Sequence, residues 1–112
     1  MLKAFFLDVK KQTLSPLLLD PLRLLDGLYT NIGCKVVEMV VEDNLTVWID
    51  EEALSKAAPF PKTMTFSVDS GPWLEGNVIF LGPIDDDGEV TDIQIPIQAL
   101  AYRITPTPEV VE

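Results

Sequence analysis

The stretch NIGCKVVEMVVEDNLTVWIDEEAL, residues 31–54, decides the fold, because two alternating runs flank a short polar turn. The apolar residues of one parity in the first run are Val37, Met39 and Val41. After the turn at residues 42–44, the period of two continues in Leu45, Val47 and Ile49. Alternation of this kind places one set of side chains on one side of a strand. The stretch therefore predicts a β-hairpin that anchors the hydrophobic core.

The residues before the hairpin predict two further strands and the main helix. Residues 2–9 are apolar on both parities, which is typical of a strand covered on both faces near the centre of a sheet. Residues 13–19 fit a second strand at a sheet edge, because Pro16 has no N–H to donate. Asp20 and Pro21 are typical of a helix start, and Gly33 of a left-handed helix end.

The residues after the hairpin predict shorter elements. They are a short helix at 50–56, strands at 63–68 and 77–81, an acidic loop at 83–89 and a flexible, proline-containing tail at 105–112. Residues 98–103 fit either a short helix or a last strand. The sequence predicts a single α+β domain over residues 1–104. It contains a mostly antiparallel or mixed sheet of about five or six strands, one main helix at about 21–31 and one or two short helices.

The charge of the chain is strongly negative and unevenly distributed. The 112 residues contain 18 acidic and 8 basic side chains, which give a net charge of −10. Residues 1–35 carry a small positive excess, whereas the remainder contains only three cations, namely Lys56, Lys62 and Arg103. Such a field repels nucleic acid and anionic membranes and attracts basic partners. We expect no direct nucleic-acid or membrane binding, and a protein partner with a basic surface or a second copy of the chain.

Most catalytic designs are excluded because the chain has no histidine. Histidine-based triads, Cys-His pairs and histidine metal sites all need that side chain. There is also no glycine-rich phosphate-binding motif, and no serine stands in a nucleophile motif. For Cys34 we expect a buried, inert thiol inside a strand. The sequence predicts a cytoplasmic protein that is not an enzyme, with no cofactor, no bound metal, no export and no membrane span.

Acidic residues after the main helix, together with one tryptophan, form the predicted protein interface. Trp48 shares its parity with Asp50, so it either anchors a partner or packs against the helix or a neighbouring strand. The loop at residues 85–89 is either a solvated turn with a positive φ at Gly88 or a Ca²⁺ or Mg²⁺ site. The predicted interface residues are Glu38, Glu42, Asp43, Trp48, Asp50, Glu51, Glu52, Asp85, Asp86, Asp87 and Glu89.

Several segments together resemble the DUF3846 family. They are MLKAFFLDV at residues 1–9, NIGCKVVEMV at 31–40, IDEEAL at 49–54, NVIFLG at 77–82, and DDDGE at 85–89 followed by TD. The similarity spans roughly residues 1–95, and the chain departs from the pattern around Phe60 and in its last twenty residues. These are small proteins of unknown function from bacteria, phages and mobile elements. The resemblance implies an accessory protein of that kind and supplies no site residues.

Three functional hypotheses follow from these observations. The first is a non-enzymatic acidic binding module that interacts with a protein partner or with itself, for instance through an open sheet edge. The second is a DNA-mimic-like inhibitor of a host nucleic-acid-binding or defence protein, which requires the negative side chains to gather on one exposed face. The third is an enzyme with a carboxylate-only or metal-assisted site, which an ordered divalent ion in the loop at residues 85–89 would favour.

Overall fold

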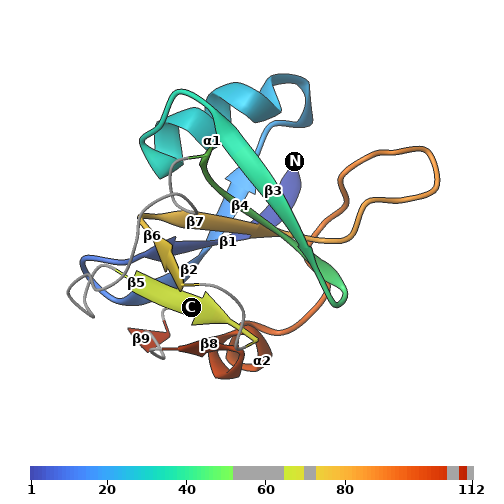
Figure 1. Ribbon diagram of the computed structural model, residues 1–112. Helices are drawn as coiled ribbons and strands as arrows, with labels where there is room; N and C mark the ends of the chain where they lie inside the picture. The colour runs from blue at the N-terminus through green and yellow to red at the C-terminus, as the bar shows by residue number, and fades with distance from the viewer. Residues whose placement is uncertain (52–64, 70–72, 106–108, 111–112) are drawn as a thin grey trace.

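Strand β1 (Leu2–Asp8) lies inside the main sheet, with an antiparallel neighbour on each side. The computed structural model describes residues 1–51, 65–69, 73–105 and 109–110. The main sheet has the strand order β3-β4-β7-β1-β2-β9 (Figure 1). All pairs are antiparallel except β2 with β9, which is parallel. The remaining strands of this sheet are β2 (Thr13–Leu19), β3 (Val37–Glu42), β4 (Leu45–Asp50), β7 (Val78–Leu81) and β9 (Glu109–Val110).

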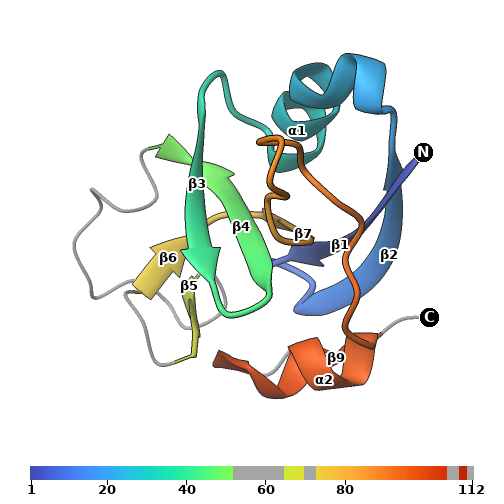
Figure 2. The same cartoon turned by 90° about the vertical axis from the view of Figure 1, so that its right-hand side faces the viewer.

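A second sheet of three short strands adds to this α+β fold. Its order is β6-β5-β8, with β5 (Thr65–Val68), β6 (Trp73–Glu75) and β8 (Ile104–Thr105). The sequence predicted a strand at residues 63–68, whose residues 65–68 form β5, but not a separate sheet. The helical elements are η1 (Pro21–Arg23), α1 (Leu24–Ile32) and α2 (Ile97–Tyr102). Figures 1 and 2 show α1 on one side of the main sheet and α2, with the small sheet, on the other. The predicted α+β class with one main helix is confirmed.

The main sheet is covered on both faces, and each face has its own hydrophobic cluster. The α1 face carries Ala4, Ile79 and Leu81, which pack with Leu28 and Ile32 of α1. The opposite face, here called the α2 face, carries one larger cluster. It contains side chains from the central strands and from α2, including Leu7, Leu14, Val47, Val78, Phe80, Leu100 and Ala101. Strand β1 contributes to both clusters, as its apolar residues of both parities predict.

Local chemistry determines where the first helix begins and ends. The Asp20 carboxylate accepts a hydrogen bond of 2.9 Å from the Leu22 N–H, and Pro21 occupies the first turn. This arrangement satisfies a backbone donor that has no partner inside the helix. At the other end Gly33 has φ 81° and donates its N–H to the Tyr29 carbonyl at 2.9 Å. The predicted helix at about 21–31 is therefore present as η1 followed by α1.

Four elements differ in detail from the sequence prediction. The hairpin turn is shorter than expected, because β3 extends to Glu42 and only Asp43 and Asn44 lie between the strands, with φ 63° at Asn44. Residues 97–102 form a helix, since their buried residues recur at helical spacing. Glu109–Val110, assigned to the flexible tail, pairs with β2. The predicted helix at 50–56 lies largely outside the described residues, and Asp50 ends β4.

Candidate protein interface at the β3 edge

Strand β3 is an open edge of the main sheet in the part of the chain that the structure describes. It hydrogen-bonds to β4 alone, in the register Val37 with Asp50 through Glu42 with Leu45. Beyond the strand, the Glu51 N–H donates to the Val36 carbonyl at 3.1 Å. Alternate residues of an antiparallel strand direct both backbone groups towards the same neighbour, and the residues between them direct theirs away. The N–H and C=O groups of residues 37, 39 and 41 therefore point outwards from the sheet.

The side chains of this edge strand differ on its two faces. On the α1 face, Met39 is 37% exposed and Val41 is 69% exposed. On the α2 face, Glu38 and Glu42 flank Val40, which packs against the core. Neither glutamate forms an ion pair with any residue that the structure describes. The edge thus offers outward-pointing backbone groups, an apolar side and an acidic side, which are the features that strand addition uses.

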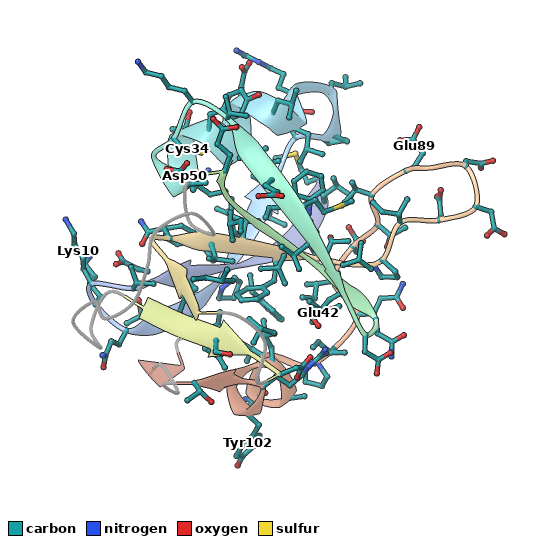
Figure 3. The ribbon with its side chains drawn as sticks, in the orientation of Figure 1. Lys10, Cys34, Glu42, Asp50, Glu89 and Tyr102 are labelled. Carbon is teal, nitrogen blue, oxygen red and sulfur yellow. The ribbon has the colours of Figure 1, made fainter. Side chains whose placement is uncertain are left out.

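The predicted interface residues do not form one continuous patch. Glu38 and Glu42 project from the α2 face, whereas Asp50 pairs with Val37 and projects from the α1 face. Glu42 and Asp43 lie at the turn end of the hairpin, and Asp50 and Glu51 lie at the other end. The labels of Glu42 and Asp50 in Figure 3 mark these two ends. Glu52 lies outside the described residues. The hairpin geometry separates these acids because neighbouring residues of a strand face opposite sides.

Part of the acidic charge at the hairpin turn is balanced by Arg103. Its guanidinium binds the Asp69 carboxylate, with Nη2 at 2.6 Å and Nε at 2.9 Å, and Nη2 also donates to the Asp43 carbonyl at 2.9 Å. Hydrogen bonding from Arg103 lowers the pKa of Asp69. Asp69, and then Asp43 and Glu42, raise the pKa of Arg103, against the opposing effect of its burial. This contact joins the turn of the hairpin to the small sheet and to the end of α2.

Replacing Arg103 with methionine should lower the free energy of unfolding by about 1–2 kcal/mol near neutral pH, because a charge-assisted hydrogen-bond pair is lost. The folded-state pKa of Asp69 lies below its ordinary value of 3.8. This contribution is therefore present above that value and is lost as the pH falls through the folded-state pKa. Urea unfolding of both proteins at neutral pH and at about pH 2 measures it. If the difference in the free energy of unfolding between the wild type and the methionine variant did not become smaller in acid, the role of Asp69 would be contradicted.

The acidic loop projects from the fold between β7 and residue 92, as Figure 1 shows at the far right. The Asp85 carboxylate accepts hydrogen bonds of 2.9 Å from the N–H groups of Asp87 and Glu89, so this side chain closes the loop on itself. Gly88 has φ 79°, as predicted for a turn. Asp86, Asp87 and Glu89 are exposed. No group of three acidic or cysteine side chains within the described ranges is arranged to hold a metal ion.

Trp48 is held inside the fold and serves as packing on the α1 face. It is half-buried among the residues that pack against the α1 cluster. Its Nε1–H donates to the Thr46 hydroxyl at 2.9 Å, and that hydroxyl donates to the Gly82 carbonyl at 2.9 Å. The indole polar group is thereby satisfied within the molecule. Of the two interpretations of Trp48, packing against the helix and neighbouring strands agrees with these contacts.

Cys34 lies just before β3 and not inside a strand, so that part of the sequence prediction was wrong. It is half-buried and lines a hollow of about 410 Å³ with Gly33, Lys35, Val36, Asp50 and Glu51. Burial raises the pKa of the Cys34 thiol, and the carboxylate of Asp50 raises it further. A raised pKa keeps the thiol protonated and a poor nucleophile. Figure 3 shows Cys34 and Asp50 close together at this end of the hairpin.

Sequence reasoning identified the acids and named an open sheet edge in general terms, but it missed that β3 is this edge and carries the row of outward-pointing backbone groups. The alternating pattern of residues 37–42 was the available signal for this edge. One face of the strand is packed at Val40, and the other face is exposed to solvent at Val41. The pattern does not reveal which strand lies at the end of the order, because pairing depends on contacts distant in sequence.

The arrangement defines a small α+β protein whose main sheet, in the described part of the chain, ends in an open, amphipathic edge strand. The chain belongs to the family described as "Domain of unknown function (DUF3846)", whose model matches residues 3–103. The match extends past residue 95, where the sequence resemblance ended. The comparisons with curated proteins and with solved structures found no match. No helix in the described part of the chain is long and apolar enough to cross a membrane.

Proposed function

We propose that this protein is a non-enzymatic binding module that receives a β-strand of a protein partner on the edge of β3. The observation that carries the proposal is the outward row of N–H and C=O groups at residues 37, 39 and 41, which no described residue pairs. Exposed edges of this kind add a strand through main-chain hydrogen bonds and take specificity from alternating side chains. The module acts in the cytoplasm, and in a host cell if a phage or mobile element encodes it.

The placement of the acids favours this module over a DNA mimic. A DNA mimic needs a row of carboxylates on one surface, comparable to the phosphates of a strand. In the hairpin, however, Glu38 and Asp50 project from opposite faces of the sheet. Arg103 also lies against the turn that carries Asp43. A metal-assisted enzyme has less support, because the Asp85 carboxylate already accepts two backbone hydrogen bonds.

Proline at position 39 tests the strand-addition function. Met39→Pro removes an outward N–H and leaves the β3–β4 hydrogen bonds in place, since residue 39 does not donate to β4. Met39→Ala is the matched control, because it loses the same side chain and keeps the N–H. Affinity pull-downs should recover a set of partners with the wild type and the alanine variant, and at least about tenfold less with the proline variant.

A second variant covers the case in which proline disturbs the fold. Val41→Lys adds a charge to the edge through an exposed side chain, and natural edge strands use lysine to block added strands. It should lower partner recovery without changing the urea unfolding midpoint. Equal recovery of the same partners by the wild type and both blocking variants would contradict the proposed function.

A further inference from the structure

The two faces of β3 specify different chemistry for whatever strand is added to it. Residues directly opposite each other on paired strands share a face and lie within contact distance. On the α2 face, an added strand meets Glu38 and Glu42, with Val40 between them. On the α1 face it meets Met39 and Val41, which are exposed and apolar. A strand that fits both faces must be amphipathic.

From this pattern we infer that the partner strand is basic and amphipathic. It carries lysine or arginine at positions i and i+4 on one face and apolar residues on the other. The inference rests on the proposed function and names the chemistry of its partner. Opposite charges directly across a strand pair stabilise it, and like charges destabilise it. The net charge of −10 adds a long-range attraction for the same kind of partner.

A second copy of the chain fits this edge poorly. When two β3 strands pair antiparallel about Val40, Glu38 of each copy faces Glu42 of the other. Pairing about Met39 places Glu38 of one copy diagonal to both Glu38 and Glu42 of the other, within reach of long side chains. Pairing about Glu38 or Glu42 places identical carboxylates opposite each other. Each of these four twofold registers therefore brings like charges together, which is a common means of preventing edge-to-edge association.

Synthetic peptides test the inference directly on the full-length protein. The basic peptide has lysine at positions 1 and 5, threonine at position 3 and valine at positions 2, 4 and 6. A second peptide has glutamate in place of lysine, and a third has the basic composition without alternation. Binding is followed by the NMR amide signals of ¹⁵N-labelled protein during titration at low and high salt. The basic peptide should bind about tenfold more tightly than the acidic one at low salt, and should perturb the amides of residues 37, 39 and 41.

Two charge-reversal variants separate the edge from the overall charge. Glu38→Lys with Glu42→Lys should reverse the preference, so that the acidic peptide binds more tightly. The matched control is Asp86→Lys with Asp87→Lys, which changes the net charge equally on exposed loop residues. The control should keep the preference for the basic peptide. Added salt should weaken the preference only partly, because screening acts most strongly on distant charges.

The outcomes distinguish this inference from the function on which it rests. Equal binding of basic and acidic peptides at the β3 amides would overturn the charge inference and leave strand addition standing. Loss of the preference in the Asp86 and Asp87 variant would show that only net charge matters, which also overturns it. No shift at the β3 amides at millimolar basic peptide overturns it as well. A dimer in light scattering that Met39→Pro dissociates would identify a second copy as the occupant.

Discussion

Gly82→Ala is expected to lower the free energy of unfolding by about 3 kcal/mol or more, a large part of the roughly 5–15 kcal/mol that stabilises a typical domain. Gly82 is buried at the exit of β7, and a Cβ there would collide with the Asp92 carbonyl oxygen and lie 2.6 Å from the Thr91 hydroxyl oxygen. A backbone carbonyl cannot move aside as the end of a flexible side chain can.

The surrounding hydrogen bonds explain why relaxation would be costly. The Gly82 N–H donates to the Thr91 carbonyl at 2.9 Å. The Asp92 carboxylate accepts from the Lys3 N–H at 2.8 Å, and the Ile93 N–H donates to the Lys3 carbonyl at 2.9 Å. Moving residues 91–93 away from Gly82 would therefore also disturb their attachment to β1. Each lost hydrogen bond costs about 0.5–1.5 kcal/mol.

Gly33→Ala is the matched control for this prediction. Gly33 has φ 81° but no atom within 4 Å of an added Cβ, so alanine there meets backbone strain without a collision. It should cost about 1–2 kcal/mol. Urea unfolding followed by circular dichroism compares the two variants with the wild type. If Gly82→Ala proved no more destabilising than Gly33→Ala, close packing at Gly82 would not be its structural role.

Phe80→Ala is expected to lower the free energy of unfolding by about 3–5 kcal/mol, because it removes the largest fully buried side chain among the described residues. Phe80 lies on β7, paired with Val47 of β4 and Phe5 of β1. Its side chain contributes to the cluster on the α2 face. Phe80 is fully buried, so its removal leaves a cavity inside the core. The packed neighbouring side chains can move into only a small part of that cavity.

Val41→Ala is the control for Phe80, because Val41 is 69% exposed on the edge strand. It should change the free energy of unfolding by no more than about 0.5 kcal/mol. The free energy of unfolding of both variants is obtained from urea unfolding curves, which are fitted with one common m value. A loss below about 1 kcal/mol for Phe80→Ala would show that the cluster on the α2 face is not the main source of stability.

The sequence alone predicted most elements of the main sheet, because local pattern specifies them. The alternation in residues 37–49 predicted β3 and β4, and the apolar run at residues 77–81 predicted β7. The cap at Asp20 and the glycine at 33 predicted both ends of the first helix. The sequence predicted the strand at residues 63–68, of which residues 65–68 form β5, but not the second sheet to which this strand belongs. The partners β6 and β8 are only three and two residues long, which is too few alternating residues to give a period.

The sequence predicted that acidic residues form the candidate site, but it predicted only in part which of them lie together in the fold. Glu38 and Glu42 were identified, and they lie on the edge that the structure exposes. Asp85, Asp86, Asp87 and Glu89 were grouped with them, although they belong to a separate projecting loop. Asp85 also closes that loop through its own backbone contacts. Net charge records how many acids a chain has, and their separation depends on where the chain turns.

The sequence by itself determined the α+β class, the hairpin and the negative charge, because these depend on residue type and on spacing over a few residues. Tertiary structure alone decided that β3 lies at the end of the sheet, that Glu38 and Asp50 face opposite sides, and that Arg103 reaches Asp43. These features depend on pairings such as β4 with β7 and on contacts between residues as far apart as 43 and 103. The free energy of the whole fold selects such long-range contacts, and no local pattern records them.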